Sequence, residues 1–159
     1  MSIEVKETTL LDELEINQCL AISKRLFGDG YHTKKFFLQD NIIKLIALKN
    51  NKIVGFFTTK RIKKKIIIDC IAIKHKWQKK KIGSLLTNYF FKNIVKNDEK
   101  VIAYAWKVDN KIPAHKINIK FGLKKIKSLG KYWKRKCNKS FKCLQYHNSC
   151  KCECVLYSN

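Results

Sequence analysis

The chain has 159 residues, of which 45% are hydrophobic, and this suffices for one domain with a sizeable core. Lys and Arg number 35 against 12 Asp and Glu, which gives a net charge of +23. No apolar run approaches the ~20 residues that span a bilayer, and the acidic start MSIEVKETTLLDELE lacks the basic-then-apolar order of a signal peptide. We expect a cytoplasmic protein, monomeric or homodimeric, with no membrane partner.

Strand and helix patterns alternate along the chain. Apolar residues at helical spacing predict a helix over residues 10–26, capped by Thr8 or Thr9, and a shorter helix is expected at 34–39. Asn50-Asn51-Lys52 joins two apolar segments and predicts a hairpin. Strands are expected at residues 3–6, 42–48, 53–59, 66–73, 101–106, 128–134 and 153–157.

The positive charge comes mostly from lysine and has two interpretations. A basic surface attracts nucleic acid or an acidic partner. Alternatively, an AT-rich genome favours lysine codons and the side chains are simply solvated. Arginine is limited to Arg25, Arg61 and Arg135, which favours the second interpretation because nucleic-acid readers rely on the arginine fork. In either case the field raises the encounter rate with a polyanionic ligand.

Residues 66–94 combine a strand, a short polar loop and a helix in that order. The loop carries Gln78, three consecutive lysines and Gly83, and apolar residues at helical spacing follow it. Backbone N–H groups of such a loop converge with the positive end of the helix on one spot. This arrangement predicts an anion site, and a diphosphate is a common occupant.

This loop resembles the acetyl-CoA loop of the GNAT N-acetyltransferases, whose signature reads Arg/Gln-x-x-Gly-x-Gly/Ala. Gln78 and Gly83 match the signature, whereas Lys81 stands where the first glycine is usual. Residues 113–123 resemble the next helix of that family and its Gly-Phe ending. Asn118 stands where the family often has a tyrosine that protonates the departing thiolate, so the usual acid is missing.

The resemblance covers residues 3–135 and implies an α/β fold with a mixed, mostly antiparallel central sheet flanked by helices. It implies an N-acetyltransferase domain at 1–135, followed by a Cys/His-rich hook at 136–159 in the same fold unit. The implied activity is direct transfer of an acetyl group from acetyl-CoA to a primary amine of a small molecule or protein. The implied cofactor-binding residues are Ile71, Ala72, Ile73, Gln78, Lys79, Lys80, Lys81, Ile82, Gly83, Ser84 and Asn110.

Asp69 is the one carboxylate on the predicted central strand and is our candidate general base. A partly buried acid is suited to accept a proton from an amine. The alternative is an outward-facing residue that balances nearby lysines. The residue pattern leaves both interpretations open.

Five of the seven cysteines fall between Cys137 and Cys154. The spacing of Cys143, His147, Cys150 and Cys152 is typical of zinc ligands and predicts a structural zinc site. Disulfides would need an oxidising compartment, and reduced, unpaired thiols are the third interpretation. Cys19 and Cys70 lie in apolar segments and are expected to be core thiols.

A second function remains open at this stage. A basic, zinc-containing nucleic-acid-binding protein on a degenerate acetyltransferase scaffold would explain the charge, the cysteines and Asn118. Gln78, Gly83 and the order of the predicted elements favour the enzyme.

Overall fold

The computed structural model describes residues 2–159. Its main strands are β1 (Glu4–Thr8), β3 (Ile42–Lys49), β4 (Lys52–Ile62), β5 (Lys65–Ile73), β6 (Lys100–Lys107), β7 (Lys124–Gly130) and β9 (Glu153–Ser158). The helices are α1 (Glu13–Phe27), α2 (Lys34–Phe37), α3 (Ile82–Tyr89) and α4 (His115–Lys120), with a 3-10 turn at His75–Trp77 and a π-helical turn at Phe90–Ile94. Two short strands, β2 (Gly28–Asp29) and β8 (Lys142–Cys143), pair apart from the main sheet.

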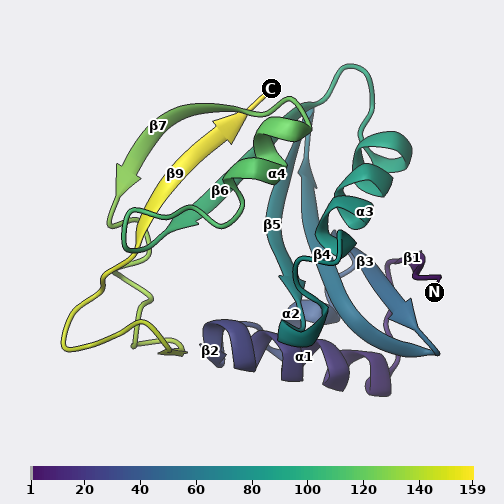
Figure 1. Cartoon of the computed structure of the whole chain (residues 1–159), viewed down its shortest axis with the longest axis horizontal. Coiled ribbons are helices and arrows are strands. Elements are labelled where there is room, and N and C mark those ends of the chain that lie inside the picture. The colour runs from purple at the N-terminus through teal and green to yellow at the C-terminus, as the bar shows by residue number, and fades with distance from the viewer. Residues whose placement is uncertain (1) are drawn as a thin grey trace.

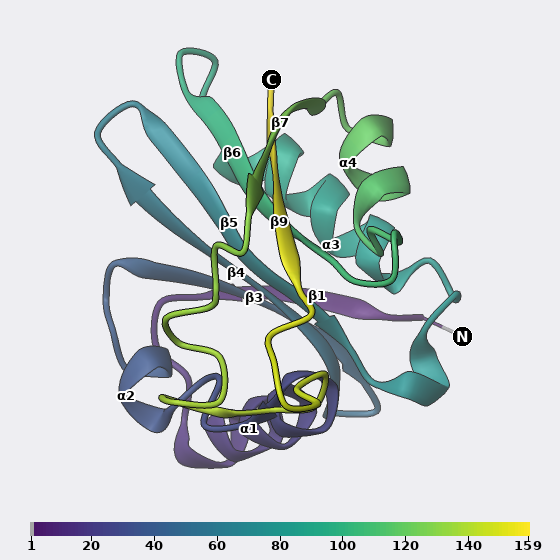
Figure 2. The same cartoon turned by 90° about the vertical axis from the view of Figure 1, so that its left-hand side faces the viewer.

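The main sheet has seven strands in the order β1-β3-β4-β5-β6-β9-β7 (Figure 1). All neighbouring pairs are antiparallel except β5 and β6. Helices α1 and α2 cover one face, and α3 and α4 cover the other (Figure 2). The predicted mixed, mostly antiparallel sheet between helices is thus confirmed. None of the helices within residues 2–159 has the length and apolar character to cross a membrane.

Local sequence signals account for several of these elements. Asn50 and Asn51 adopt φ values of 49° and 58°, the left-handed conformation that a two-residue hairpin turn requires. Strand β7 begins at Lys124, earlier than predicted, because Gly122, with φ 82°, ends α4 and turns the chain directly into the sheet.

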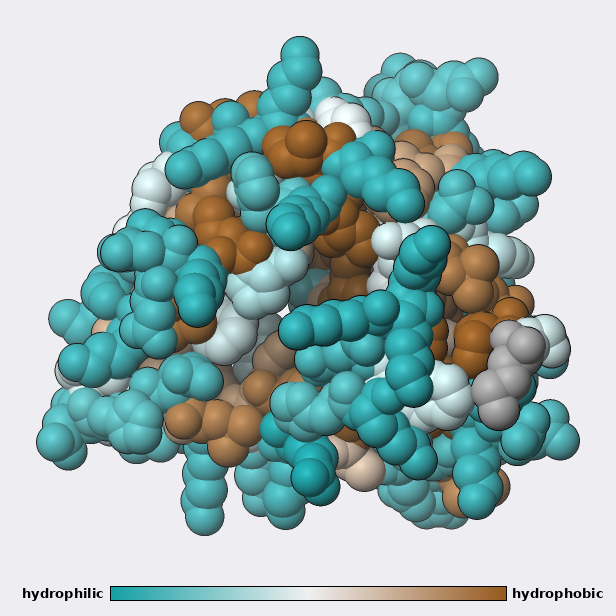
Figure 3. Space-filling view, viewed as in Figure 1, coloured by the Kyte–Doolittle hydropathy of each residue, from teal (hydrophilic) through white to brown (hydrophobic). Residues whose placement is uncertain are grey.

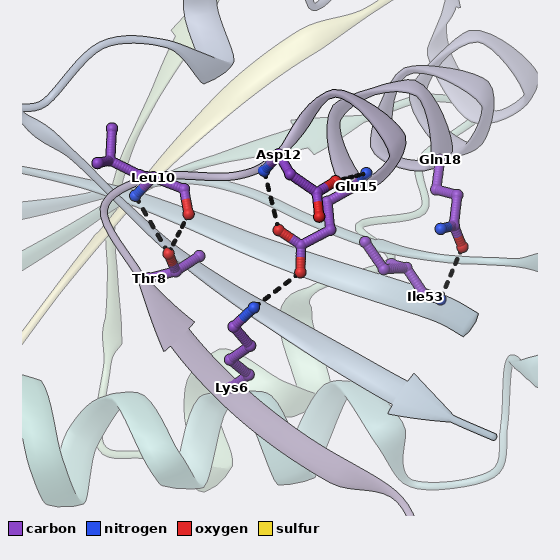
Figure 4. Close-up of polar contacts among 7 residues, drawn as sticks. All are labelled: Lys6, Thr8, Leu10, Asp12, Glu15, Gln18 and Ile53. Atoms are coloured by element: carbon purple, nitrogen blue, oxygen red, sulfur yellow. Dashed lines mark hydrogen bonds and ion pairs between the residues drawn. The ribbon is translucent and has the colours of Figure 1, made fainter. Parts of the chain in front are cut away.

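Helix α1 begins at a capping box formed by Asp12 and Glu15, and not at the threonines named above (Figure 4). Asp12 Oδ1 accepts a hydrogen bond from the Glu15 N–H at 2.7 Å, and Glu15 Oε2 accepts one from the Asp12 N–H at 3.1 Å. Lys6 donates to Glu15 at 2.8 Å, and Gln18 Oε1 accepts from the Ile53 N–H at 2.9 Å. These contacts fix α1 against β1 and β4.

Two apolar cores lie on the two faces of the sheet. Under α1 and α2 the buried residues include Ile16, Cys19, Ile22, Phe37, Phe56, Cys70 and Ala72. Under α3 and α4 they include Leu45, Phe57, Ile66, Leu86, Phe90, Val101, Ala103, Leu123 and Tyr157. Burial raises the pKa of the Cys19 thiol to about 12, so this thiol stays protonated at neutral pH, as expected of a core residue.

Strand β5 contains a bulge at Asp69. On β4, Thr59 pairs with Ile68 and Thr58 pairs with Cys70, so Asp69 is an extra residue without an opposing partner. The parallel pairing of β5 with β6 stops at Ile68 and Ala103. The bulge in β5 therefore lies where β5 and β6 stop pairing. From this point, which we call the fork, the two strands diverge (Figure 1).

An ion pair lies at the other end of β5 and β6, where these two strands are still paired. The Arg61 guanidinium on β4 donates to both oxygens of Glu99, just before β6, and to the Ile94 carbonyl at 2.7 Å. Glu99 also accepts from the Lys96 N–H at 2.9 Å. The Glu99 side chain is 3% exposed, and its hydrogen bond from Arg61 lowers its pKa.

Replacing Arg61 with Ala should lower the free energy of unfolding by about 2 kcal/mol, because it leaves a buried carboxylate without its partner. For a chain of this length that corresponds to a fall of roughly 4–8 °C in the melting temperature. Lys64→Ala is the matched control, since its pair with Asp98 is exposed and should contribute little. Because the folded-state pKa of Glu99 is lowered, its contribution is present at neutral pH and is lost as pH falls below about 4.3. Thermal denaturation at neutral and acid pH checks both statements, and equal effects of the two substitutions would contradict them.

Candidate functional site

The space between the diverging arms of β5 and β6 forms the centre of the site. Beyond Ile68 and Ala103, no pairing joins these two strands within residues 2–159. Backbone groups on the facing edges of residues 69–73 and 104–107 are therefore free to bind a ligand. The surface in Figure 3, seen from the same side as Figure 1, is hollowed near its centre, where the strands diverge.

A cavity of about 380 Å³ lies on the α3 and α4 side of this opening, and we call it the loop cavity. Residues of the predicted loop and of α4 line it together. The lining residues are Ile73, Trp77, Gln78, Lys79, Lys81, Ile82, Gly83, Ser84, Pro113, Lys116, Ile117 and Lys120.

The backbone of the loop explains how it can hold an anion. Lys79 and Lys81 both adopt left-handed φ values, 60° and 62°. Lys81 is the N-cap of α3 and makes no side-chain capping bond, so the first N–H groups of this helix have no side-chain acceptor. Free N–H groups at the positive end of a helix form a site for a negatively charged group.

Four lysine side chains surround the loop cavity, and only two of them are on the predicted loop. Lys79 and Lys81 come from the loop, and Lys116 and Lys120 come from α4. The two α4 lysines were missed from sequence, although their i, i+4 spacing places them on one helix face. Lys80, in contrast, does not line the cavity; its ammonium lies 4.8 Å from the Trp77 ring.

Other predicted cofactor residues have structural roles beside the cavity. Gln78 Nε2 donates to the Ile73 carbonyl at 3.0 Å and fixes the loop to the end of β5. The side chains of Ile71 and Ala72 pack into the two cores on opposite faces, so their backbone groups alone can meet a ligand. A methyl group at Gly83 would lie 3.6 Å from Ile117 Cδ1, an ordinary contact, so neither space nor backbone conformation requires glycine there.

Two asparagines named in the sequence analysis lie elsewhere. Asn110 lies with Asp109 in an exposed turn, bridged by Val108 and Lys111, and does not line the loop cavity. Asn118 is 4% exposed on α4, and its Nδ2 has no hydrogen-bond partner within residues 2–159. An amide at this position cannot supply a proton near neutral pH, as expected from the sequence.

The bulge places the Asp69 carboxylate at the fork of the opening. Asp69 Oδ2 accepts a hydrogen bond from Thr58 Oγ1 at 3.0 Å and lies 3.2 Å from His32 Nε2. The other imidazole nitrogen, Nδ1, lies 2.7 Å from Ser23 Oγ. A neutral imidazole that donates from Nε2 and accepts from Ser23 satisfies all of these contacts. They hold one carboxylate oxygen and leave Oδ1 available to a ligand.

His32 was not identified from the sequence. It is 6% exposed and lies among aromatic rings of Phe27, Tyr31, Phe36, Phe37 and Phe56, with centroid distances from 4.7 to 6.2 Å. Its partners Ser23 and Asp69 lie on different elements, and Asp69 is 37 residues away in the chain. This packing orients the ring, and through it the carboxylate.

Residues 153–158 of the predicted hook form strand β9, so the name hook is kept from here on for the segment 131–152, which folds back over the end of α1. Strand β8 of the hook pairs with β2, and a Cβ atom at Gly28 would lie 1.8 Å from the Lys142 carbonyl oxygen. This close approach requires glycine. Between them lies an apolar cavity of about 70 Å³, the hook cavity, lined by Leu26, Phe27, Tyr31, Trp106, Trp133, Cys137, Phe141, Cys143, Leu144, Gln145, Cys150 and Cys152.

The predicted zinc ligands are not assembled in this structure. No group of three or more His, Cys, Asp or Glu side chains within residues 2–159 is placed to hold a metal ion. Cys143, Cys150 and Cys152 line the hook cavity together with Cys137, but His147 does not. All the cysteines are free thiols, and burial raises the pKa of Cys137 to about 12. Spacing thus identified thiols that meet, but not a metal site.

Comparison with solved structures identifies the fold. An aminoglycoside 6'-N-acetyltransferase complexed with coenzyme A matches with a TM-score of 0.73 and 11% identity, over 98% of this chain and 96% of that chain. The ribosomal-protein-S18-alanine N-acetyltransferase from Escherichia coli matches with a TM-score of 0.75 and 11% identity, over 99% and 92%. Arabidopsis thaliana Naa50, in complex with the bisubstrate analogue CoA-Ac-MVNAL, matches with a TM-score of 0.74 and 17% identity, over 100% and 99%. Comparisons of sequence match no family model and no curated protein.

The left-handed conformation at Lys81 predicts that glycine substitutions at two neighbouring lysines change the free energy of unfolding in opposite directions. Lys81→Gly should raise the free energy of unfolding by about 0.5–1 kcal/mol, because glycine adopts the left-handed conformation without the steric cost that lysine incurs. Lys80→Gly removes an identical side chain at a position without a left-handed φ and should lower it. Urea denaturation of both variants measures the two changes, and stabilisation by both would show that loop strain is not the cause.

Proposed function

Since the chain has the fold of the GNAT N-acetyltransferases, we propose that it is an acetyl-CoA-dependent enzyme that transfers acetyl directly to a primary amine. The supporting observation is the loop cavity, in which the N-terminal turn of α3 and four lysines lie next to Ile73 at the end of β5. A diphosphate in this cavity would be neutralised from two sides. The proposed cytoplasmic location and the oligomeric state remain predictions from the sequence.

The opening between the strands supports the rest of the proposal. The edge of β5 at residues 71–73 that faces β6 is unpaired, apart from the Ile73 carbonyl held by Gln78, and is suited to bind the pantetheine amides as a neighbouring strand would. A pantetheine arm bound there would place the thioester near the fork, where the Asp69 carboxylate lies. Binding both reactants in one orientation supplies much of the acceleration expected of a direct transfer.

Asp69 is the group we assign to proton removal. The attacking amine forms a bond to the acetyl carbon, the carbon–sulfur bond breaks, and the amine proton passes to Asp69 Oδ1. Thr58 and His32 hold Oδ2 and keep the carboxylate directed at the opening. Asn118 cannot protonate the thiolate, so water is the proton source we assign to the departing sulfur.

The alternative function has less support. A zinc-containing nucleic-acid-binding protein would need a metal centre, and residues 2–159 contain no group placed to form one. The positive charge that favoured nucleic-acid binding is explained in part by the four lysines that line the loop cavity. The enzyme is the function that the site supports best.

The cofactor assignment predicts a contrast between neighbouring lysines. Lys81→Glu combined with Lys116→Glu should weaken CoA binding at least tenfold, because two cations of the loop cavity are reversed. Lys80→Glu combined with Lys63→Glu reverses the same number of charges outside the cavity, one of them on the same loop, and should have a much smaller effect. Isothermal titration calorimetry with CoA measures all three proteins. Equal losses in both variants would point to the overall charge and against the cavity.

The catalytic assignment predicts that Asp69→Asn lowers turnover by about 10²–10⁴-fold, the usual contribution of a general base. Affinity for acetyl-CoA should not change, because Asp69 does not line the loop cavity. Asp98→Asn, at an exposed carboxylate, serves as the control. Release of free CoA thiol with a panel of amines gives the rates, and undiminished turnover in Asp69→Asn would exclude this residue as the base.

A further inference from the structure

A third cavity, of about 440 Å³, lies on the α1 side of the sheet at the end of β5, and we call it the basic cavity. Helix α1 contributes mainly apolar side chains to it, and the segment after β5 contributes cations. Its lining residues are Ala21, Ile22, Arg25, Leu26, Lys74, His75 and Lys76. No carboxylate is among them.

The cations of the basic cavity lack counter-ions. Arg25, Lys74 and Lys76 take part in none of the ion pairs found within residues 2–159. Burial lowers the pKa of Lys74, and the positive charges of Lys76 and Lys52 lower it further. Mutual repulsion among these groups would be relieved by a bound anion.

Lys74 is partly buried, whereas Arg25 and Lys76 are exposed at the rim of the basic cavity. Lys74 differs from the other cations that are shielded from solvent. The fully buried Lys44 donates to the carbonyl oxygens of Thr9 at 2.6 Å and Gln39 at 2.7 Å, and Arg61 pairs with Glu99. Arg25 lies in the last turn of α1, where it also offsets the negative end of the helix dipole. Lys74 has neither kind of partner, which singles out the basic cavity as a site that an external group completes.

The basic cavity lies on the side of the sheet where the amine acceptor would bind, opposite the loop cavity. The loop cavity uses the α3 and α4 side of the opening, and the two cavities share no residue. The basic cavity shares Leu26 with the hook cavity, and both lie on the α1 side. A second substrate that reaches Asp69 from the side opposite the cofactor would pass along these two cavities.

The length of chain between Asp69 and Lys74 gives the distance that such a substrate would have to span. Asp69 and Lys74 are separated by five residues, about 16 Å along an extended strand. The flexible lysine stem shortens the gap, so an anionic group and a reacting amine would lie about 10 Å apart. A free amino acid is too short for this span, whereas a peptide with an acidic side chain at its second or third residue can cover it.

We propose that the basic cavity binds a carboxylate of the acceptor, and that the acceptor is an acidic peptide presenting its N-terminal amine to Asp69. The apolar hook cavity, next to it along α1, receives an uncharged part of the same peptide. This inference rests on the proposed acetyltransferase function and specifies its substrate class.

The test measures peptide binding to full-length protein saturated with CoA, so that the loop cavity is occupied. The probes are synthetic peptides that begin Ser-Glu-Glu, Ser-Gln-Gln or Ser-phosphoserine-Glu and are otherwise identical. Calorimetry at about 0.1 M salt should show the Glu peptide binding at least tenfold more tightly than the Gln peptide. Arg25→Ala combined with Lys74→Ala should remove this difference.

The control removes two equivalent charges elsewhere. Lys63→Ala combined with Lys92→Ala changes exposed lysines outside all three cavities and should leave the preference for the Glu peptide intact. Equal loss in both double variants, or equal binding of Glu and Gln peptides by the wild type, would overturn the proposal. So would a preference shown by the phosphoserine peptide alone, or a loss of CoA affinity in the Arg25 and Lys74 variant, which would assign the cavity to the cofactor.

Acetylation of the same peptides, followed by mass spectrometry, separates this inference from the proposed function. Equal acetylation of the Glu and Gln peptides would refute the inference and leave the enzyme assignment standing. Selective binding of the Glu peptide without any acetylation would support the anion site and refute the acetyltransferase assignment.

Discussion

The end of backbone pairing between β5 and β6 is the constraint on which the rest of the structure depends. Each strand remains paired on its other side, with β4 or β9, so the sheet stays intact while its centre opens. The bulge at Asp69 sits at the fork and shifts the alternation of β5: Ile68 faces the α3 side, and Cys70 faces the α1 side. One extra residue thus both interrupts the strand and places the carboxylate at the fork.

The loop after β5 depends on a backbone that its residues do not favour. A left-handed conformation at Lys79 and Lys81 costs roughly 1–2 kcal/mol per residue. Strain of this kind persists where surrounding structure holds it, and it often marks ligand sites. The hydrogen bond from Gln78 Nε2 to the Ile73 carbonyl ties this loop to the end of β5. A lysine in place of glycine therefore keeps the loop shape and adds a cation.

Features set by residues close together in the chain could be predicted from the sequence, whereas contacts between distant residues could not. The Asn50-Asn51 turn and the polar loop before α3 are set by adjacent residues, and both are present in the structure, although α3 already begins at Ile82. The contact of His32 with Asp69 depends on the docking of α1 and the following turn onto the sheet, and a single histidine gives no periodic signal of it.

The cysteines show the same limit from another side. Chain spacing indicated that Cys143, Cys150 and Cys152 would gather, and they do line one cavity. Spacing does not fix side-chain direction, so it could not show that His147 stays outside this cavity. It also could not show that their common surface is an apolar cavity over α1 and not a metal centre.

The excess of lysine is more organised than its abundance suggests. The segment from Ile73 to Ser84 separates two cavities, with Lys79 and Lys81 facing one and Lys74 and Lys76 lining the other. An anion bound in either cavity lowers the positive potential in the other, but screening over a Debye length of about 8 Å keeps this opposition small. The two cavities can therefore hold anions at the same time, as the proposed transfer between two anionic substrates would require. Part of the charge that composition alone attributed to solvated side chains thus lines two separate cavities near the end of β5.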